Sequence, residues 1–124
     1  ARERTAWGYP PVFGPGADKW QPLALMHNPP SLMAPLLMHL ADSEFIISME
    51  TLAAYEKADR PVEARIFPQE HHLKAQPRHR IAIYCRNLRW FGFWLNQSIS
   101  PDSCPAHVAE TERWAALKAR AAPD

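Results

Sequence analysis

The sequence predicts an α/β fold in which a strand, a helix, a second strand and a second helix follow one another. Two observations lead to this prediction. Residues 34–40 form an apolar run of strand length and residues 62–66 alternate between apolar and charged, and apolar residues recur at three- and four-residue intervals after each segment. Two parallel strands joined by a helix form a right-handed crossover unit. Because two strands cannot bury an apolar sheet alone, we expect the unit to end a larger α/β sheet.

Length and composition limit the possible functions. A chain of 124 residues with 47% hydrophobic and 22% charged residues suits one globular domain and is too short for two. A net charge of +1 gives no reason to expect nucleic acid or an anionic membrane as a partner. No apolar run approaches the roughly 20 residues that span a bilayer. The start Ala1-Arg2-Glu3-Arg4 lacks an initiator Met and suggests a fragment, a processed chain or a trimmed one.

Residues 1–33 are expected to be an irregular, proline-rich segment. Pairs of prolines at 10–11 and 29–30, with Pro15 and Pro22 between them, block long helices and central strands. A structureless stretch of this length is uncommon in a small independent domain. The segment is therefore expected to cross the surface of a larger body.

Residues 34–97 are expected to form the strand–helix–strand–helix unit. The run from Ala34 to Leu40 predicts a strand buried on both faces, and His39 within it is expected to be a core histidine with satisfied hydrogen bonds. Asp42 and Ser43 then act as turn or N-cap residues, with Glu44 in the first turn of a helix. This helix extends to about residue 58, and its buried face is expected to include Phe45, Ile46, Met49, Leu52 and Ala53.

The second half of the unit follows the same pattern. Residues 62–66 alternate between apolar and charged side chains, which predicts a second strand that ends at Phe67-Pro68. A loop over residues 69–77 leads to a helix whose apolar face includes Ile81, Tyr84, Cys85, Leu88, Phe91 and Leu95. The aromatic residues from Trp90 to Trp94 are expected in the core. Four arginines are expected to form a solvated helix face, namely Arg78, Arg80, Arg86 and Arg89.

Residues 98–124 are expected to form a C-terminal helical tail. The helical pattern is interrupted at residues 100–103. Pro105 suits a first helical turn, and a short polar helix reaches about Arg120. Two cysteines, Cys85 and Cys104, are too few for a disulfide framework. Cys85 is therefore expected to be a core residue of its helix.

Candidate chemical groups follow both strands. In parallel sheets, functional side chains gather at the carboxyl ends of the strands. The first strand ends before Asp42 and Glu44, and the second before Glu70, His71 and His72. If the strands are neighbours, a carboxylate and a histidine share one rim. A serine hydrolase needs this pair, because the carboxylate orients the imidazole that takes the proton of the serine.

Two segments resemble the prolyl oligopeptidase family of α/β-hydrolases. Residues 35–42 are similar to the strand before the catalytic acid, and residues 60–72 to the last strand and histidine loop. Within that family the chain is most similar to the lasso peptide isopeptidases, over roughly residues 20 to 97. The matching motifs are Ala41–Phe45, Glu70–Lys74, Gln76-Pro77 and Asn87–Leu95.

The resemblance implies a fold and a reaction. Residues 1–124 would be the C-terminal part of an α/β-hydrolase domain of a bacterial peptidase. The enzyme would open a threaded lasso peptide at its isopeptide bond through an acyl-enzyme. His72 aligns with the catalytic histidine and His71 with the preceding glycine of the family motif. Glu44 is favoured as the triad acid, with Asp42 as the alternative acid.

The resemblance also implies what this chain does not supply. None of its serines lies in a Gly-x-Ser-x-Gly nucleophile elbow, and the family order of serine, acid and histidine places the nucleophile upstream of Ala1. The chain alone should be inert. Its expected partners are a peptide substrate and the upstream part of the enzyme, which carries the serine and a propeller domain. No cofactor or metal is expected, and the expected compartment is the bacterial cytoplasm.

Other interpretations remain open. Glu70, His71, His72 and His79 could bind a metal, although adjacent histidines on a loop rarely ligate one ion. The chain could be a non-catalytic interaction module that binds through the apolar end of its last patterned helix. Within the enzyme class, an oligopeptidase or dipeptidyl peptidase acting on linear peptides is the alternative. Lys74 in the histidine loop is a candidate for substrate contact.

Overall fold

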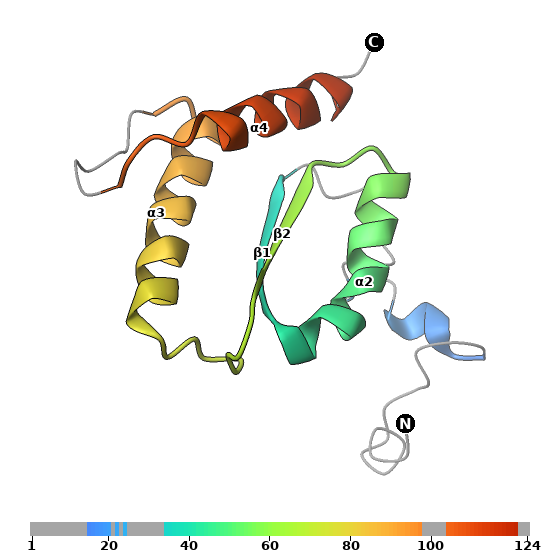
Figure 1. Ribbon diagram of the computed structural model, residues 1–124. Coiled ribbons are helices and arrows are strands. Elements are labelled where there is room, and N and C mark those ends of the chain that lie inside the picture. Colours follow the sequence, from blue (N-terminus) through green and yellow to red (C-terminus); the bar gives the residue numbers. More distant parts are fainter. Residues whose placement is uncertain (1–14, 21, 23, 25–33, 98–103, 122–124) are drawn as a thin grey trace.

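The computed structural model describes residues 15–20, 22, 24, 34–97 and 104–121. Most of the proline-rich segment and residues 98–103 lie outside the described residues. The interruption predicted at 100–103 falls within this second stretch. The elements in chain order are η1 (Ala17–Trp20), β1 (Leu36–Ala41), α2 (Asp42–Lys57), β2 (Val62–Phe67), α3 (Pro77–Trp94) and α4 (Val108–Ala121). Figure 1 shows α2 on one side of the two strands and α3 on the other, with α4 crossing near the end of α3.

The two strands pair in parallel, and their carboxyl ends are adjacent. The register runs from Leu36 opposite Val62 to Ala41 opposite Phe67. Parallel pairing requires a crossover connection, which α2 supplies. The predicted α/β class and element order are confirmed. The register brings the first residues of α2 and the loop after β2 to one edge of the sheet.

Helix α2 begins one residue earlier than expected. Ala41 is its N-cap, with extended backbone and no capping side chain, so the prediction of Asp42 or Ser43 as N-cap is wrong. Instead, Glu44 reaches back and accepts a hydrogen bond from the Ala41 N–H at 2.7 Å. This is the glutamate half of a capping box. It fixes the Glu44 carboxylate over the end of β1.

The predicted buried face of α2 is largely exposed. Ile46 is 75% and Met49 50% exposed, and the one buried side chain of the helix is Tyr55. The prediction of a helix with this apolar spacing is confirmed, but the prediction that Ile46 and Met49 are buried is wrong. Two strands lie only about 5 Å apart and cover a narrow strip, so a helix face that extends past this strip finds no partner in the described residues.

Helix α3 shows the same contrast along its length. Cys85 and Trp90 are buried, whereas four residues of the predicted face are at least half exposed, namely Ile81, Tyr84, Phe91 and Leu95. At its far end the ring of Trp90 packs edge-on against Trp114 of α4, with centroids 5.3 Å apart. The prediction that the aromatic end contributes to the core is confirmed for Trp90, which is 3% exposed.

The expectation of a solvated arginine face is wrong for Arg86, which is 3% exposed. Its guanidinium donates to Glu63 of β2 and to Glu110 of α4, each at 2.5 Å. Arg89 also pairs with Glu110, at 2.7 Å. A charge is buried only when partners satisfy it, and here the partners come from a strand and a helix distant in sequence. Glu63 accepts a further bond from the Trp114 indole.

The cysteines also differ from expectation. Cys85 is buried, as predicted, but it forms a disulfide bond with Cys104. The bridge ties α3 to the segment before α4, so one pair of cysteines stabilises this junction without a larger framework. Helix α4 begins at Val108, and Pro105 therefore precedes it instead of opening it. Among the described residues, no helix is long and apolar enough to cross a membrane.

Candidate functional site

The candidate site lies at the edge where both strands end. Asp42 and Glu44 belong to the first turn of α2, and the loop over residues 68–76 leaves β2 beside them. Gln69 adopts the left-handed region in this loop, with φ of 57°. Its N–H donates to Oδ2 of Asp42 at 3.1 Å. This bond joins the helix start to the loop and holds an uncommon backbone conformation for a residue with a side chain.

Glu44 and His72 form the central pair. Oε1 of Glu44 lies 2.5 Å from Nδ1 of His72, although the residues are 28 positions apart in sequence. The His72 side chain is 88% exposed and that of Glu44 is 18% exposed. In the part of the chain that the structure describes, Nε2 of His72 has no hydrogen-bond partner. An imidazole held at Nδ1 and open at Nε2 can accept a proton from a group that approaches from solvent.

Glu44 is held as a carboxylate. The Ala41 N–H and the Lys74 ammonium both donate to Oε2, at 2.7 and 2.9 Å, while Oε1 faces His72. The backbone hydrogen bond from Ala41, followed by those from Lys74 and His72, lowers the pKa of Glu44 from 4.5 to about 2. Glu44 is therefore ionised across the range in which hydrolases operate. It can orient the His72 ring and stabilise its protonated form.

Asp42 occupies a different position. Oδ1 accepts from the Ser43 N–H at 3.0 Å, and Oδ2 accepts from the Gln69 N–H. The structure thus directs both oxygens of Asp42 to backbone groups, whereas Glu44 contacts the imidazole. Of the two acids that the sequence left open, Glu44 has the geometry to pair with His72. Asp42 holds the loop that carries the histidine.

Lys74 has a contact that the sequence analysis missed. Its side chain is only 8% exposed, and its ammonium binds Glu44 as well as the carbonyl oxygen of His72, at 3.1 Å. Lys74 was expected to be a candidate for substrate contact. The sequence does contain a signal for its contact with an acid, because a single lysine follows the histidine in a loop opposite two carboxylates. That signal does not reveal which carboxylate the lysine binds.

Glu70 shapes the loop from within. The carboxylate is buried and accepts hydrogen bonds from the N–H groups of Ala75 and Gln76 at 2.8 and 3.0 Å, and from Nδ1 of His79 at 2.8 Å. Burial raises its pKa, but these bonds outweigh burial and hold the pKa below the ordinary value. Among the described residues, no group of three His, Cys, Asp or Glu side chains is arranged to hold a metal ion. Of the four residues of the metal hypothesis, Glu70 pairs with His79, His72 pairs with Glu44, and His71 is exposed.

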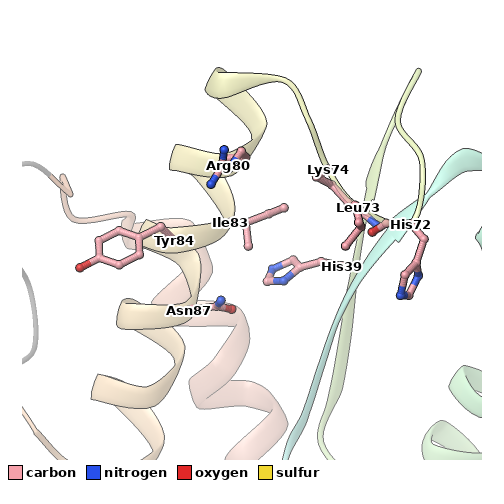
Figure 2. A pocket seen from close by; sticks show the side chains of 8 residues that line it. All are labelled: His39, His72, Leu73, Lys74, Arg80, Ile83, Tyr84 and Asn87. Carbon is pink, nitrogen blue, oxygen red and sulfur yellow. The ribbon is translucent and has the colours of Figure 1, made fainter.

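His39 is not the satisfied core histidine that the sequence predicted. Its Nε2 is buried without a hydrogen-bond partner among the described residues, and burial, with nearby Arg86, lowers its pKa to about 4. The ring faces a cavity of about 400 Å³ between the strands and α3. Figure 2 shows His39 pointing toward α3 and His72 lying on the other side of the strand ends. Both histidines line this cavity, His39 from β1 and His72 from the loop after β2, and only His72 contacts Glu44.

No described serine is hydrogen-bonded to His72. Ser43 and Ser48 both lie within α2, and the Ser48 hydroxyl donates to the carbonyl oxygen of Glu44 at 2.9 Å. The other four serines lie outside the described residues, and none stands between the glycines of a nucleophile elbow. The described residues therefore present a carboxylate and a histidine with no serine bonded to the imidazole.

Comparison with known proteins gives one clear relationship. No family model matches the chain. Over 100 residues, or 81% of the chain, it is 40% identical to the lasso peptide isopeptidase AtxE2 of Asticcacaulis excentricus. The matched region is 14% of that protein, so the chain spans only a small part of its relative.

Solved structures of that relative have the same fold over almost the whole chain. One is a serine-to-alanine variant of AtxE2 isopeptidase with Astexin3-dC4 bound, with a TM-score of 0.79 and 36% identity over 96% of this chain and 18% of that one. The structure without ligand gives a TM-score of 0.77 and 35% identity over the same shares. The predicted resemblance to the lasso peptide isopeptidases is confirmed, because the chain is homologous to the C-terminal portion of AtxE2.

Proposed function

We propose that the chain is the acid- and histidine-bearing part of a serine isopeptidase of the prolyl oligopeptidase family, which opens threaded lasso peptides. The observation that carries the proposal is the Glu44–His72 pair, with His72 open at Nε2, in a chain homologous to an isopeptidase. The solved serine-to-alanine variant of AtxE2 supports the substrate class and a serine nucleophile, because that variant holds an astexin peptide.

The proposed reaction assigns each group one role. Glu44 accepts the Nδ1–H of His72, which leaves Nε2 as the base. A serine from the upstream part of the enzyme gives its proton to Nε2 and attacks the isopeptide carbonyl, which belongs to an Asp or Glu side chain of the substrate. His72 then protonates the leaving N-terminal amine, and an ester links the serine to the side chain. Water gives a proton to His72 and attacks this ester. The serine oxygen then leaves and takes that proton back from His72, which releases the linear peptide with a free side-chain carboxylate.

The upstream part of the enzyme is the proposed partner of the exposed apolar faces. Ile46 and Ile47 on α2 and Ile81 on α3 are each more than half exposed in the described chain. A sheet with more strands beside β1 would cover such faces, and the same strands would carry the serine to the open side of His72. The proposed chemistry needs no cofactor, because a carboxylate, an imidazole and a hydroxyl complete each proton transfer.

The proposed compartment is the bacterial cytoplasm, as the family resemblance implies. The Cys85–Cys104 bridge is more typical of oxidising compartments, so the redox state of the two thiols is a direct check. Trapping free thiols during lysis of the native cells should label both cysteines if the protein is cytoplasmic. Full protection from labelling would place it in an oxidising compartment.

A hydrolysis assay with the full-length protein tests the substrate. A threaded lasso peptide and its linear counterpart are incubated with the enzyme and followed by mass spectrometry. The proposal predicts that the threaded peptide gains one water and unthreads. Cleavage of linear peptides alone would indicate an oligopeptidase instead, and no cleavage of either substrate would favour a non-catalytic interaction module.

A further inference from the structure

A buried lysine connects both members of the proposed catalytic pair. The Lys74 side chain is 8% exposed, and its ammonium lies 2.9 Å from Oε2 of Glu44 and 3.1 Å from the carbonyl oxygen of His72. Lysine is rarely buried unless its charge is paired. Here one cation binds the side chain of the acid and the main chain of the histidine.

We propose that Lys74 is a positioning residue that directs Oε1 of Glu44 toward His72. This inference rests on the proposed function for its catalytic consequence, although the geometry is independent of it. A glutamate has a long side chain whose terminal torsion is broad, so a carboxylate at the start of a helix can rotate freely. Two donors on Oε2, the Ala41 N–H and the Lys74 ammonium, fix the plane of the carboxylate and leave Oε1 for the imidazole.

The bond to the His72 carbonyl provides the second half of the argument. The loop after β2 is held at its beginning by Asp42, through Gln69, and farther along by Glu70, through Ala75 and Gln76. His72 lies between these two anchors, with its side chain in solvent. The Lys74 bond is the described contact that fixes the His72 main chain directly to the acid. It therefore controls the distance between the two groups as well as the orientation of Glu44.

Charge adds to the positioning. Asp42 and Lys74 flank the pair, and His39 and Arg80 line the same cavity as His72 and Lys74. Lys74 is the permanent cation that directly contacts Glu44. It keeps Glu44 ionised without competing for the oxygen that faces His72. Lys74 lines the same cavity as His72, and its ammonium is directed to Glu44 and to the His72 carbonyl oxygen.

The test uses the full-length protein with Lys74→Met, Lys74→Arg and Leu73→Ala. Methionine keeps most of the volume and removes the charge, arginine keeps the charge, and Leu73 is an exposed neighbour, at 83% exposure, that serves as a control. A small misplacement of a catalytic group can cost about 100-fold. We therefore expect Lys74→Met to lower kcat about 10- to 100-fold with KM unchanged. Lys74→Arg should restore part of kcat, and Leu73→Ala should have no effect.

A spectroscopic measurement makes the result independent of turnover. The Nδ1–H proton of an imidazole bonded to a carboxylate gives a proton NMR signal far downfield, and His72→Ala identifies it. Its loss or broadening in Lys74→Met, in a protein that remains folded, supports positioning even if no lasso peptide is cleaved, in which case the proposed function alone fails. An unchanged signal with unchanged kcat overturns the inference. An increase in KM alone would assign Lys74 to substrate binding instead.

Discussion

The two ends of the sheet use charge in opposite ways. Near the amino end of α4, Arg86 pairs with both Glu63 and Glu110 and is 3% exposed. At the carboxyl ends of the strands, Glu44 is bound on one side by Lys74 and on the other by a histidine that is 88% exposed. The first network is closed in the sense that arginine side chains bind both of its carboxylates. The second network is open, because it ends in an imidazole nitrogen that faces solvent. A closed network suits a structural role, and an open one suits a reaction with a group that approaches from solvent.

The largest expected effect is on the open pair. Glu44→Gln in the full-length protein should lower kcat by about 10,000-fold, because an amide can hold the imidazole in the wrong tautomer and cannot stabilise its protonated form. Asp42→Asn is the matched comparison: it removes one acceptor from a backbone N–H but no contact with the imidazole, and should lower kcat far less than Glu44→Gln. Steady-state kinetics on the threaded peptide measures both. The reverse ranking would make Asp42 the acid.

The closed network should affect stability and leave chemistry unchanged. Arg86→Met leaves two carboxylates without their shared partner and should lower the free energy of unfolding by about 3–5 kcal/mol. Arg113→Met removes an exposed arginine from the same Glu63, at 3.1 Å, and should cost less than about 1 kcal/mol. Urea unfolding of the full-length variants gives both values. Equal costs would show that burial does not distinguish the two arginines.

The disulfide bond should contribute less than the buried arginine. It joins residues 19 positions apart, and opening a loop of this size costs roughly 3 kcal/mol by the chain-entropy argument. The double variant Cys85→Ser with Cys104→Ser should therefore unfold at lower urea concentration while kcat is retained. Reductant should lower the unfolding midpoint of the unaltered protein and leave that of the variant unchanged. Equal sensitivity of both proteins to reductant would contradict this account.

The smallest expected effect is a pH dependence of stability at the rim. The folded pKa of Glu44, about 2, lies below its ordinary value of 4.5, so the unfolded chain takes up the proton first as the pH falls. The stability that Glu44 contributes is complete above about pH 4.5 and is lost as the pH falls toward 2. Unfolding midpoints measured from pH 5 to pH 2.5 should fall less steeply for Glu44→Gln than for the unaltered protein. Parallel curves would exclude this contribution.

Local pattern was enough to predict the elements and the shared rim. The apolar runs and helical spacing located β1, α2, β2 and α3 to within a few residues. Parallel strands end at one edge, so the approach of residues 42–44 to residues 70–72 followed from element order. The sequence could not choose between Asp42 and Glu44, because that choice depends on the Ala41 N–H and the Lys74 ammonium both binding one oxygen of Glu44.

Tertiary partners explain the predictions that were wrong. Arg86 looks like any polar helix residue until Glu63 and Glu110 approach it from other elements. Cys104 lies beyond the patterned helix, and its pairing with Cys85 depends on how the chain returns. The apolar spacing on α2 predicted a buried face, but Ile46 is exposed because the described chain supplies only two strands.

The most direct test of the central claim compares His72→Ala with His71→Ala in the full-length protein. The two histidines are adjacent and exposed, and His72 alone contacts Glu44. Mass spectrometry of a threaded lasso peptide measures the uptake of one water. The account predicts that His72→Ala abolishes this uptake and that His71→Ala retains it. Retained hydrolysis in His72→Ala would show that the Glu44–His72 pair does not carry the reaction.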